Sequence, residues 1–229
     1  MEAAGEVDAR AILVSAHVIF DYSKTVTEFS ALATNQPDTS YSVTKRFAYL
    51  DAMRRIEKGQ DIVVVMPGAV YGPSPVVKRS LDRAGFNGRF LAAIRGETKQ
   101  WVRVFAIFVL VDDVARMILR AADVGATGAT YLAHGHEDSI RTIADAQNQA
   151  CELAGSKFRV REVNAADIPK GSEHEFGGFT QVQLARSGSP TPLVDGSFTR
   201  EALDFTPTPF DEGMATTVAW YRELGELDR

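Results

Sequence analysis

Two largely apolar runs of residues place the strongest constraint on the fold of this 229-residue chain. Residues 9–20 (ARAILVSAHVIF) and 61–66 (DIVVVM) contain many β-branched side chains, and Pro67-Gly68 ends the second run. Strands that are apolar along most of their length are buried on both faces, which is typical of parallel sheets. The pattern therefore predicts two strands of a buried parallel sheet.

The stretch between these runs predicts a helix from Tyr41 to Gly59, preceded by a turn at Pro37-Asp38. Its apolar residues recur at intervals of three or four: Val43, Phe47, Leu50, Met53 and Ile56. Strand, helix and strand in this order indicate a βαβ unit, and therefore an α/β fold.

The remainder of the chain predicts shorter elements. The expected strands are residues 102–110, 130–133 and 157–163, and the expected helices follow Asp112-Asp113, run from Ser139 to Gly155 and cover 211–224. Residues 169–196 are rich in Gly, Ser, Pro and Thr, which predicts a long loop over a pocket or a small satellite element.

The composition is that of a globular protein with a core, since 45% of the residues are hydrophobic and 24% are charged. The net charge of −5 and the scarcity of basic clusters argue against nucleic-acid binding. The longest apolar run, residues 104–111, is too short to span a membrane. The N-terminus has no signal-peptide pattern, and the single cysteine, Cys151, excludes an intrachain disulfide, so we expect a cytoplasmic protein.

Tyr41 and Lys45 are the strongest candidate for chemistry. Residues four apart lie on one face of a helix, so the phenol and the ammonium point the same way. An ammonium beside a phenol favours the phenolate, so we expect Lys45 to lower the pKa of Tyr41. Such a pair can move a proton on or off a substrate oxygen. The alternative interpretation is a solvated helix start.

Three other groups of residues have weaker functional interpretations. His134-Gly135-His136 could hold a metal, but no further histidine or cysteine stands at ligand spacing, so we expect a turn and no metal. Asp112 and Asp113 could act as paired carboxylates, although a role at a helix start explains both. The arginines that could meet a phosphate are Arg79, Arg89 and Arg103.

Six stretches follow one another in an order that a known protein family shares. They are VSAHVIFD (14–21), Thr27-Glu28, YSVTK (41–45), VVVMPGAVYGP (63–73), FVLVDDVARMIL (108–119) and TPTPFDEGMATTVAWYRE (206–223). In this order they resemble the extended short-chain dehydrogenase/reductase family, also called NAD-dependent epimerase/dehydratases. The resemblance implies a Rossmann-like, doubly wound parallel sheet and a smaller, interleaved C-terminal substrate lobe.

The resemblance also implies roles for particular residues. Tyr41 would be the catalytic acid/base, and Lys45 would hold the nicotinamide ribose. Pro67 and Val70 would line the nicotinamide side of the site. The cofactor would be NAD or NADP, the partner a small-molecule substrate, and a homodimer through the Tyr41 helix is implied as well.

The first departure from the family concerns the dinucleotide fingerprint, because neither G-x-G-x-x-G nor G-x-x-G-x-x-G occurs. By the resemblance, Met1 falls before the family's fifth strand, so the half of the fold that grips the pyrophosphate would be missing. We prefer a truncated start to a lost cofactor, and a partner chain that covers the exposed sheet is a further alternative. Residues 1–71 would then be the remaining half of the dinucleotide-binding domain. Residues 72–229 would be mainly the substrate lobe, with 108–135 returning to the Rossmann sheet.

The second departure lies at the catalytic Ser/Thr of the family, which aligns with Ala16. The neighbouring Ser15 remains the candidate catalytic hydroxyl, but neighbours on a strand face opposite sides, so it would need a bulge or a register shift. His17 and Ser42 are the other residues that could compensate.

The third departure makes the substrate pocket less polar. Ala69 and Met66 replace an Asn and an Arg that are common in members acting on nucleotide sugars. The function that we expect is therefore an NAD(P)-dependent oxidoreductase, a dehydrogenase/reductase or epimerase, acting on a carbonyl or hydroxyl. The alternatives are a nucleotide-sugar epimerase/dehydratase and a non-catalytic binding or scaffold protein.

Overall fold

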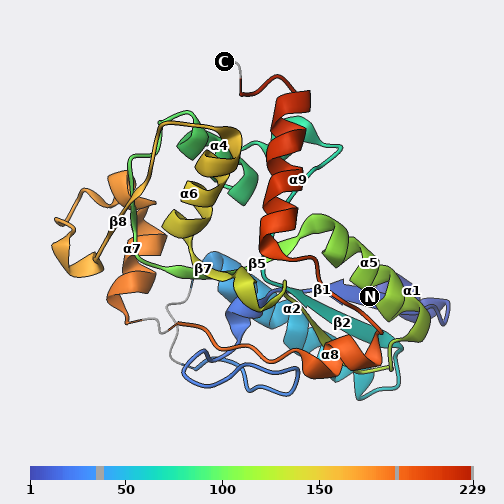
Figure 1. Ribbon diagram of the computed structural model, residues 1–229. Helices are drawn as coiled ribbons and strands as arrows, with labels where there is room; N and C mark the ends of the chain where they lie inside the picture. Colours follow the sequence, from blue (N-terminus) through green and yellow to red (C-terminus); the bar gives the residue numbers. More distant parts are fainter. Residues whose placement is uncertain (35–38, 189–190, 228–229) are drawn as a thin grey trace. The chain divides into compact units, whose positions relative to one another are not determined.

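The computed structural model describes residues 1–34, 39–188 and 191–227, so the turn expected at Pro37-Asp38 lies outside the described residues (Figure 1). The chain divides into two compact units, each built from three segments. Unit 1 contains Met1–Gly68, Asp112–His134 and Pro192–Pro207, and unit 2 contains Ala69–Val111, Gly135–Thr191 and Thr208–Arg229.

Unit 1 is built on a sheet of three parallel strands in the order β1-β2-β6 (Figure 1). The strands are β1 (Ala11–Val14), β2 (Ile62–Pro67) and β6 (Thr130–Ala133). The helices of this unit are α1 (Glu2–Glu6), α2 (Ser40–Ile56), α5 (Val111–Val124) and α8 (Ser197–Ala202). Because α2 connects the parallel strands β1 and β2, the predicted βαβ unit is confirmed.

The two edges of this sheet differ. Every residue of β2 is buried, as expected for a central strand. The outer edge of β6 is covered, because the backbone N–H of Leu132 donates to Thr199 Oγ1 at 2.8 Å. The described residues provide no strand on the outer side of β1, where Val14 is 38% exposed.

The run 9–20 does not form one strand as predicted. β1 ends at Val14, and a 3₁₀ turn at His17–Ile19 follows. The turn directs Ile19 and Phe20 into a core that also contains Met66 of β2, and both side chains are fully buried. The apolar character of the run therefore reflects burial rather than one continuous strand.

Helix α2 begins close to the predicted position, and Gly59 follows its end with a φ of 90°. Its apolar repeat is only partly buried. Phe47 is 67% exposed and Leu50 is 42% exposed, whereas the buried residues of the helix are Ser42 and Ala52. The outer face of α2 is therefore apolar and open to solvent.

Unit 2 contains one three-stranded sheet and one pair of strands. β5 (Phe105–Leu110) pairs in parallel with β3 (Ala69–Tyr71) and antiparallel with β7 (Ile140–Thr142). β4 (Gln100–Val102) pairs in parallel with β8 (Arg161–Val163). The helices are α3 (Val77–Ser80), α4 (Phe86–Ile94), α6 (Ile143–Ala154), α7 (Phe179–Arg186) and α9 (Phe210–Glu223).

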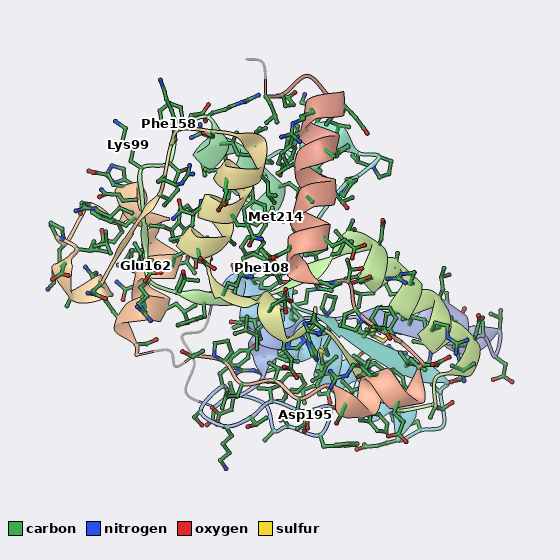
Figure 2. The ribbon with its side chains drawn as sticks, viewed as in Figure 1. Lys99, Phe108, Phe158, Glu162, Asp195 and Met214 are labelled. Carbon is green, nitrogen blue, oxygen red and sulfur yellow. The ribbon has the colours of Figure 1, made fainter. Side chains whose placement is uncertain are left out.

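Aromatic side chains form the centre of unit 2. Phe108 of β5 has ring contacts to its aromatic neighbours at centroid distances from 5.1 to 6.0 Å. These neighbours are Tyr71, Phe86, Phe90 and Phe210. Figure 2 labels Phe108 together with Met214 of α9, and both are fully buried. Free Cys151 is buried in the same core.

Several predicted boundaries in unit 2 are wrong. The expected strand 102–110 is divided into β4 and β5. The pairing of β4 with β8 ends at Val102, and the pairing of β5 with β7 begins at Phe105, so residues 103–104 lie between the two strands. Ser139 does not cap α6; Thr142 does, by accepting the N–H of Asp145 at 3.2 Å. Pairing covers only 161–163 of the expected strand 157–163. Residues 169–196 contain α7, which agrees with the expected alternative of a small satellite element. No helix in the described ranges is both long and apolar enough to cross a bilayer.

Candidate functional site

Tyr41 and Lys45 lie together at the start of α2, as their spacing predicts. Tyr41 is 57% exposed, and Lys45 Nζ lies 5.8 Å from the centroid of its ring. Lys45 Nζ also donates a hydrogen bond of 3.1 Å to the backbone carbonyl of Val14, the last residue of β1. The pair therefore lies at the carboxyl end of a parallel strand, where α/β sheets commonly bind ligands.

A capping box holds the start of the helix that carries the pair. Thr39 Oγ1 accepts the backbone N–H of Ser42 at 3.1 Å, and Ser42 Oγ accepts the backbone N–H of Thr39 at 3.0 Å. Ser42 Oγ also lies 3.0 Å from the Thr39 carbonyl, to which it can donate. These bonds occupy Ser42 and place Tyr41 in the first turn.

The pKa of Tyr41 does not shift as predicted. Partial burial of the phenol raises its pKa above the usual value of a tyrosine, because desolvation disfavours the phenolate. The Lys45 ammonium lies over the ring and bonds to Val14. The expected lowering by Lys45 is therefore wrong for this arrangement, and Tyr41 is a neutral phenol near neutral pH.

Ser15 and Ala16 remain in extended backbone beyond the end of β1. The Ser15 N–H donates to the Val65 carbonyl at 2.9 Å, and Ala16 has φ −162° and ψ 146°. Ser15 Oγ is buried and has no hydrogen-bond partner among the described residues. The backbone has no bulge that would turn Ser15 to the side of Ala16.

A buried pair of histidines lies at the same end of the sheet. His17 follows β1, His134 follows β6, and their rings meet edge to face with centroids 6.4 Å apart. Burial, followed by the neighbouring His134, lowers the pKa of His17 to about 3. The Met66 backbone partly opposes this shift, although neither ring nitrogen of His17 reaches a described partner with full hydrogen-bond geometry.

Gly196 packs directly against His134. A Cβ atom at Gly196 would lie 2.1 Å from His134 Nε2, so only glycine fits the observed arrangement. The sequence contained one signal of the pair, since His134 follows a predicted strand and His17 lies within another. Burial of His17 agrees with its place in the run 9–20, which the sequence predicts to be buried, whereas its contact with His134 joins residues that are far apart in the chain.

Pro67 and Val70 lie on different units. Pro67 is buried at the end of β2, opposite Ala133 of β6. Val70 is on β3 in unit 2, is 37% exposed and lines a cavity of about 300 Å³ that Arg79 also lines. Each of the two residues is therefore placed within its own unit.

The possible metal ligands, the aspartate pair and Arg103 are the weaker candidates, and the structure gives each of them a local environment. The described residues contain no group of three His, Cys, Asp or Glu side chains that could hold a metal. Asp112 and Asp113 lie in the first turn of α5, where Asp113 is buried and contacts Arg116. Arg103 forms an ion pair with Glu162 at 3.2 Å.

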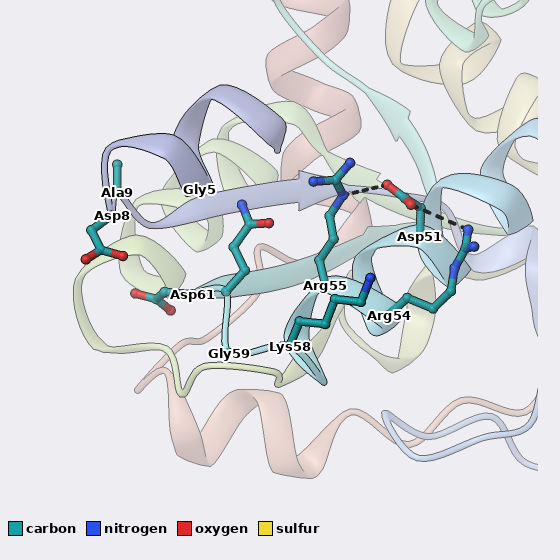
Figure 3. A pocket seen from close by; sticks show the side chains of 10 residues that line it. Gly5, Asp8, Ala9, Asp51, Arg54, Arg55, Lys58, Gly59 and Asp61 are labelled. Carbon is teal, nitrogen blue, oxygen red and sulfur yellow. Dashed lines mark hydrogen bonds and ion pairs between the residues drawn. The ribbon is translucent and has the colours of Figure 1, made fainter.

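A cavity of about 480 Å³ lies at the other end of α2 (Figure 3). Its charged side chains are largely paired, since Asp51 accepts from Arg54 at 3.4 Å and from Arg55 at 2.8 Å. Asp51 is ten residues from Tyr41, or about 15 Å along a helix. The charge pairing and this separation exclude the cavity as the site of chemistry at Tyr41.

No protein-family profile matches the chain. One curated relative is sterol demethylase protein B of Methylococcus capsulatus, 27% identical over 84% of this chain. Another is a dTDP-4-dehydro-6-deoxy-D-allose reductase of a Streptomyces species, 27% identical over 81% of this chain. The chain spans 59% and 51% of the lengths of these relatives.

Solved structures share the fold. A nucleoside-diphosphate-sugar epimerase from Pseudomonas aeruginosa matches 98% of this chain with a TM-score of 0.74 at 20% identity, covering 70% of that protein. A dTDP-glucose 4,6-dehydratase of Bacillus anthracis, in complex with NAD, matches 99% of this chain with a TM-score of 0.72 at 18% identity, covering 66% of that protein. These likenesses confirm the Rossmann-like α/β fold, and at the level of fold they confirm the resemblance to the extended short-chain dehydrogenase/reductases.

Proposed function

We propose that the protein is an NAD(P)-dependent oxidoreductase of the extended short-chain type, a dehydrogenase/reductase or epimerase, with Tyr41 as its acid/base. The observation that carries this proposal is the pair at the start of α2. An exposed phenol lies under the ammonium of Lys45, which Val14 anchors at the carboxyl end of β1. A solvated helix start would not require the bond from Lys45 to the strand.

The residues present suit the nicotinamide ribose of NAD or NADP. Lys45 Nζ has three N–H donors, and the contacts of the described residues use one of them, on Val14. The other two can bond ribose hydroxyls. In this proposal Pro67 and Val70 line the nicotinamide side. Ser15, whose buried hydroxyl has no described partner, is the candidate catalytic hydroxyl, and it would need a register shift of β1 to face the site.

The proposed mechanism assigns proton transfer to the protein. The nicotinamide, when bound, supplies or accepts the hydride. Tyr41 donates its phenolic proton to the substrate oxygen when a carbonyl is reduced, and accepts it when a hydroxyl is oxidised. The raised pKa of Tyr41 keeps the proton in place before transfer, which favours the direction of reduction.

The substrate in this proposal is a small molecule with a carbonyl or hydroxyl. The names of the relatives support two classes, a sterol-like molecule and a nucleotide-linked dehydro sugar. Met66 and Ala69 carry apolar side chains at the positions that the resemblance gives to a polar Arg and Asn, which supports a less polar pocket and favours the first class. The nucleotide-sugar epimerase/dehydratase remains the second candidate, because solved neighbours carry those names.

The proposal is tested with the full-length protein by following nicotinamide absorbance with sterol ketones and dTDP-linked dehydro sugars. Tyr41→Phe should lower turnover by about 10²–10⁴-fold, with little change in cofactor affinity. Tyr49→Phe is the matched control, because it removes a phenol hydroxyl from the same helix, outside the pair. Equal losses in both variants, or no cofactor-dependent turnover with any substrate, would support the non-catalytic alternative.

A further inference from the structure

The segment that leads from α6 into β8 carries charged and aromatic side chains that the proposed reaction does not use. Its residues 156–161 have the sequence SKFRVR. Lys157, Arg159 and Arg161 are exposed, and Phe158, between the first two, is 41% exposed. A single exposed phenylalanine is ordinary on a protein surface, and it indicates a contact only where its surroundings are organised for one.

Hydrogen bonds at both ends fix the backbone of this segment. Ser156 Oγ donates to the Ile94 carbonyl at the end of α4 at 2.7 Å. The side-chain amide of Asn148 accepts from the Val160 N–H at 2.7 Å and donates to the Val160 carbonyl at 2.9 Å. The backbone that carries Phe158 is therefore ordered in advance, so a contact through the ring costs little further ordering.

Phe158 lies against the backbone that follows α4 without being buried there. A Cβ atom at Gly96 would be 2.6 Å from the Phe158 ring, so only glycine allows this approach. Lys157 Nζ lies 5.5 Å from the centroid of the same ring. An apolar ring and a cation are thus presented together, a combination that peripheral proteins use at the boundary between lipid headgroups and acyl chains.

Lys99 adds a fourth cation to this surface. The backbone N–H of Arg161 donates to the Lys99 carbonyl at 2.9 Å, so the two residues come from neighbouring, hydrogen-bonded segments. Figure 2 shows Lys99 and Phe158 toward the same side of unit 2. We call Lys99, Lys157, Phe158, Arg159 and Arg161 the basic surface.

The carboxylates next to the basic surface leave most of its charge uncompensated. Glu97 contacts Arg83, and Glu162 pairs with Arg103 at 3.2 Å, so both bind arginines outside the basic surface. Glu152, exposed in the last turn of α6, is the remaining carboxylate of the neighbouring segments. In the part of the chain that the structure describes, no ion pair engages the four cations. This local excess contrasts with the net charge of −5 of the whole chain.

We propose that the basic surface binds an anionic lipid bilayer, with Phe158 among the headgroups and the four cations on lipid phosphates and carboxylates. The charges alone would suit any polyanion. The ring, however, gains from apolar surroundings beside the anions, which the headgroup region provides. Each cation near an anionic leaflet adds to the attraction, and the contact is peripheral.

This surface also suits one class of substrate considered above. A sterol-like molecule dissolves in bilayers, so binding to lipid would bring the protein to its substrate, and in this respect the inference rests on the proposed function. Lipid binding itself requires neither cofactor nor turnover. A failure of vesicle binding therefore leaves the proposed reaction standing, and a failure of turnover leaves the lipid contact standing.

The test is cosedimentation of the 229-residue chain with vesicles of phosphatidylcholine alone and of an equimolar mixture with phosphatidylserine. We expect saturable binding to the mixed vesicles at millimolar lipid and little binding to phosphatidylcholine. High ionic strength should release the chain, because salt screens contacts between exposed charges. No binding to the mixed vesicles, or equal binding to both kinds, would overturn the proposal.

Polyglutamate at the same charge concentration tests the alternative of an acidic protein partner. A soluble polyanion offers the Phe158 ring no apolar surroundings, so we expect the chain to stay on the mixed vesicles. Complete release by polyglutamate would assign the basic surface to acidic polymers and overturn the lipid assignment.

Matched charge variants connect the binding to this surface. Lys99→Gln combined with Lys157→Gln should lower the partition coefficient onto mixed vesicles by about tenfold or more, because each cation near an anionic leaflet contributes separately. Lys24→Gln combined with Lys78→Gln is the control, since it removes the same charge from exposed lysines outside the basic surface. Equal losses in the two double variants would show that net charge controls the binding, against the proposal.

Variants of Phe158 test the apolar part of the contact. Phe158→Ala should weaken binding several-fold at each ionic strength, because salt does not screen apolar insertion. Phe179→Ala is the control, since Phe179 is 67% exposed on α7 of the same unit. Phe158→Trp keeps a ring over Gly96, and its indole emission should move to shorter wavelength on mixed vesicles. Undiminished binding of Phe158→Ala, or unchanged emission of Phe158→Trp, would contradict the insertion of this ring.

Discussion

The surroundings of Tyr41 determine whether reduction of a carbonyl or oxidation of a hydroxyl is expected to be favoured at neutral pH. Because burial raises its pKa, the phenol carries its proton throughout the neutral range. We therefore expect reduction by the full-length protein to change little with pH up to the ordinary tyrosine range, and oxidation to accelerate as pH rises toward it. Stopped-flow rates of hydride transfer in both directions measure this. An oxidation rate that is already at its plateau at neutral pH would contradict the raised pKa.

His17 predicts how the stability of the chain depends on pH. Its pKa is about 3 in the folded chain, against 6.5 as the ordinary value, so the unfolded chain binds a proton first as pH falls. The free energy of unfolding should therefore decrease below pH 6.5, by at most about 1.4 kcal/mol per pH unit from this residue, until pH 3 is approached. His134 faces the same ring.

The measurement for His17 is urea unfolding of the chain between about pH 4 and pH 8, a range that spans most of the expected decrease, compared with His17→Phe. The phenyl ring keeps the edge-to-face contact and removes the proton-binding nitrogens. The variant should show a shallower decrease in stability at acid pH. Parallel curves for the two proteins would mean that His17 is solvated or already protonated in the folded state.

At the residue scale, the sequence predicted the pairing of Tyr41 with Lys45 but neither its anchor nor its electrostatics. Helical periodicity alone places the two side chains on one face. Lys45 donates to the backbone carbonyl of Val14. Every residue carries a backbone carbonyl, so the sequence alone does not indicate which one accepts this bond. The pKa of Tyr41 depends on the extent of burial, which arises from the packing of distant segments.

At the scale of elements, the start of α2 determines where Tyr41 lies. Thr39→Ala removes the acceptor for the Ser42 N–H and should destabilise the helix by about 1 kcal/mol. Fraying of the first turn should also lower turnover of the full-length protein more than cofactor affinity, because Tyr41 lies within that turn. Chemical denaturation and steady-state kinetics together test this.

Thr44→Ala is the control for the capping box. Its hydroxyl bonds the Ser40 carbonyl from an exposed position inside the same helix, so its loss removes no cap. A stability loss in Thr44→Ala equal to that in Thr39→Ala would contradict the special role of the cap.

The elements that the sequence predicted well are those whose signals are local and repeated. β2 and the start of β1 follow from apolar runs, and the end of α2 follows from Gly59. Residues 102–110 are predicted as one strand because the apolar run continues through Val104, between β4 and β5. Ser139 and Thr142 are equally good capping residues by type. Thr142 is the cap of α6, because residues 140–142 form β7 and pair with β5 before the helix begins.

At the scale of the whole molecule, the exposed face of α2 supports the proposed homodimer. Phe47 and Leu50 expose large apolar side chains to solvent, and so does Val14 at the open edge of β1. Clustered exposed apolar residues mark protein–protein contacts more often than isolated ones do. We therefore expect two copies of the chain to associate through α2.

The association is measured by sedimentation velocity over a range of protein concentrations. Phe47→Lys combined with Leu50→Lys should shift the chain to the monomer, because apposed lysines repel each other and remove apolar area. The cost in monomer stability should be small, about 0.5 kcal/mol or less, since both residues are exposed. Leu119→Lys provides the matched control, because Leu119 is 66% exposed in the same unit but lies on α5. A monomer in the unmodified chain, or dissociation by Leu119→Lys alone, would show that α2 is not the contact.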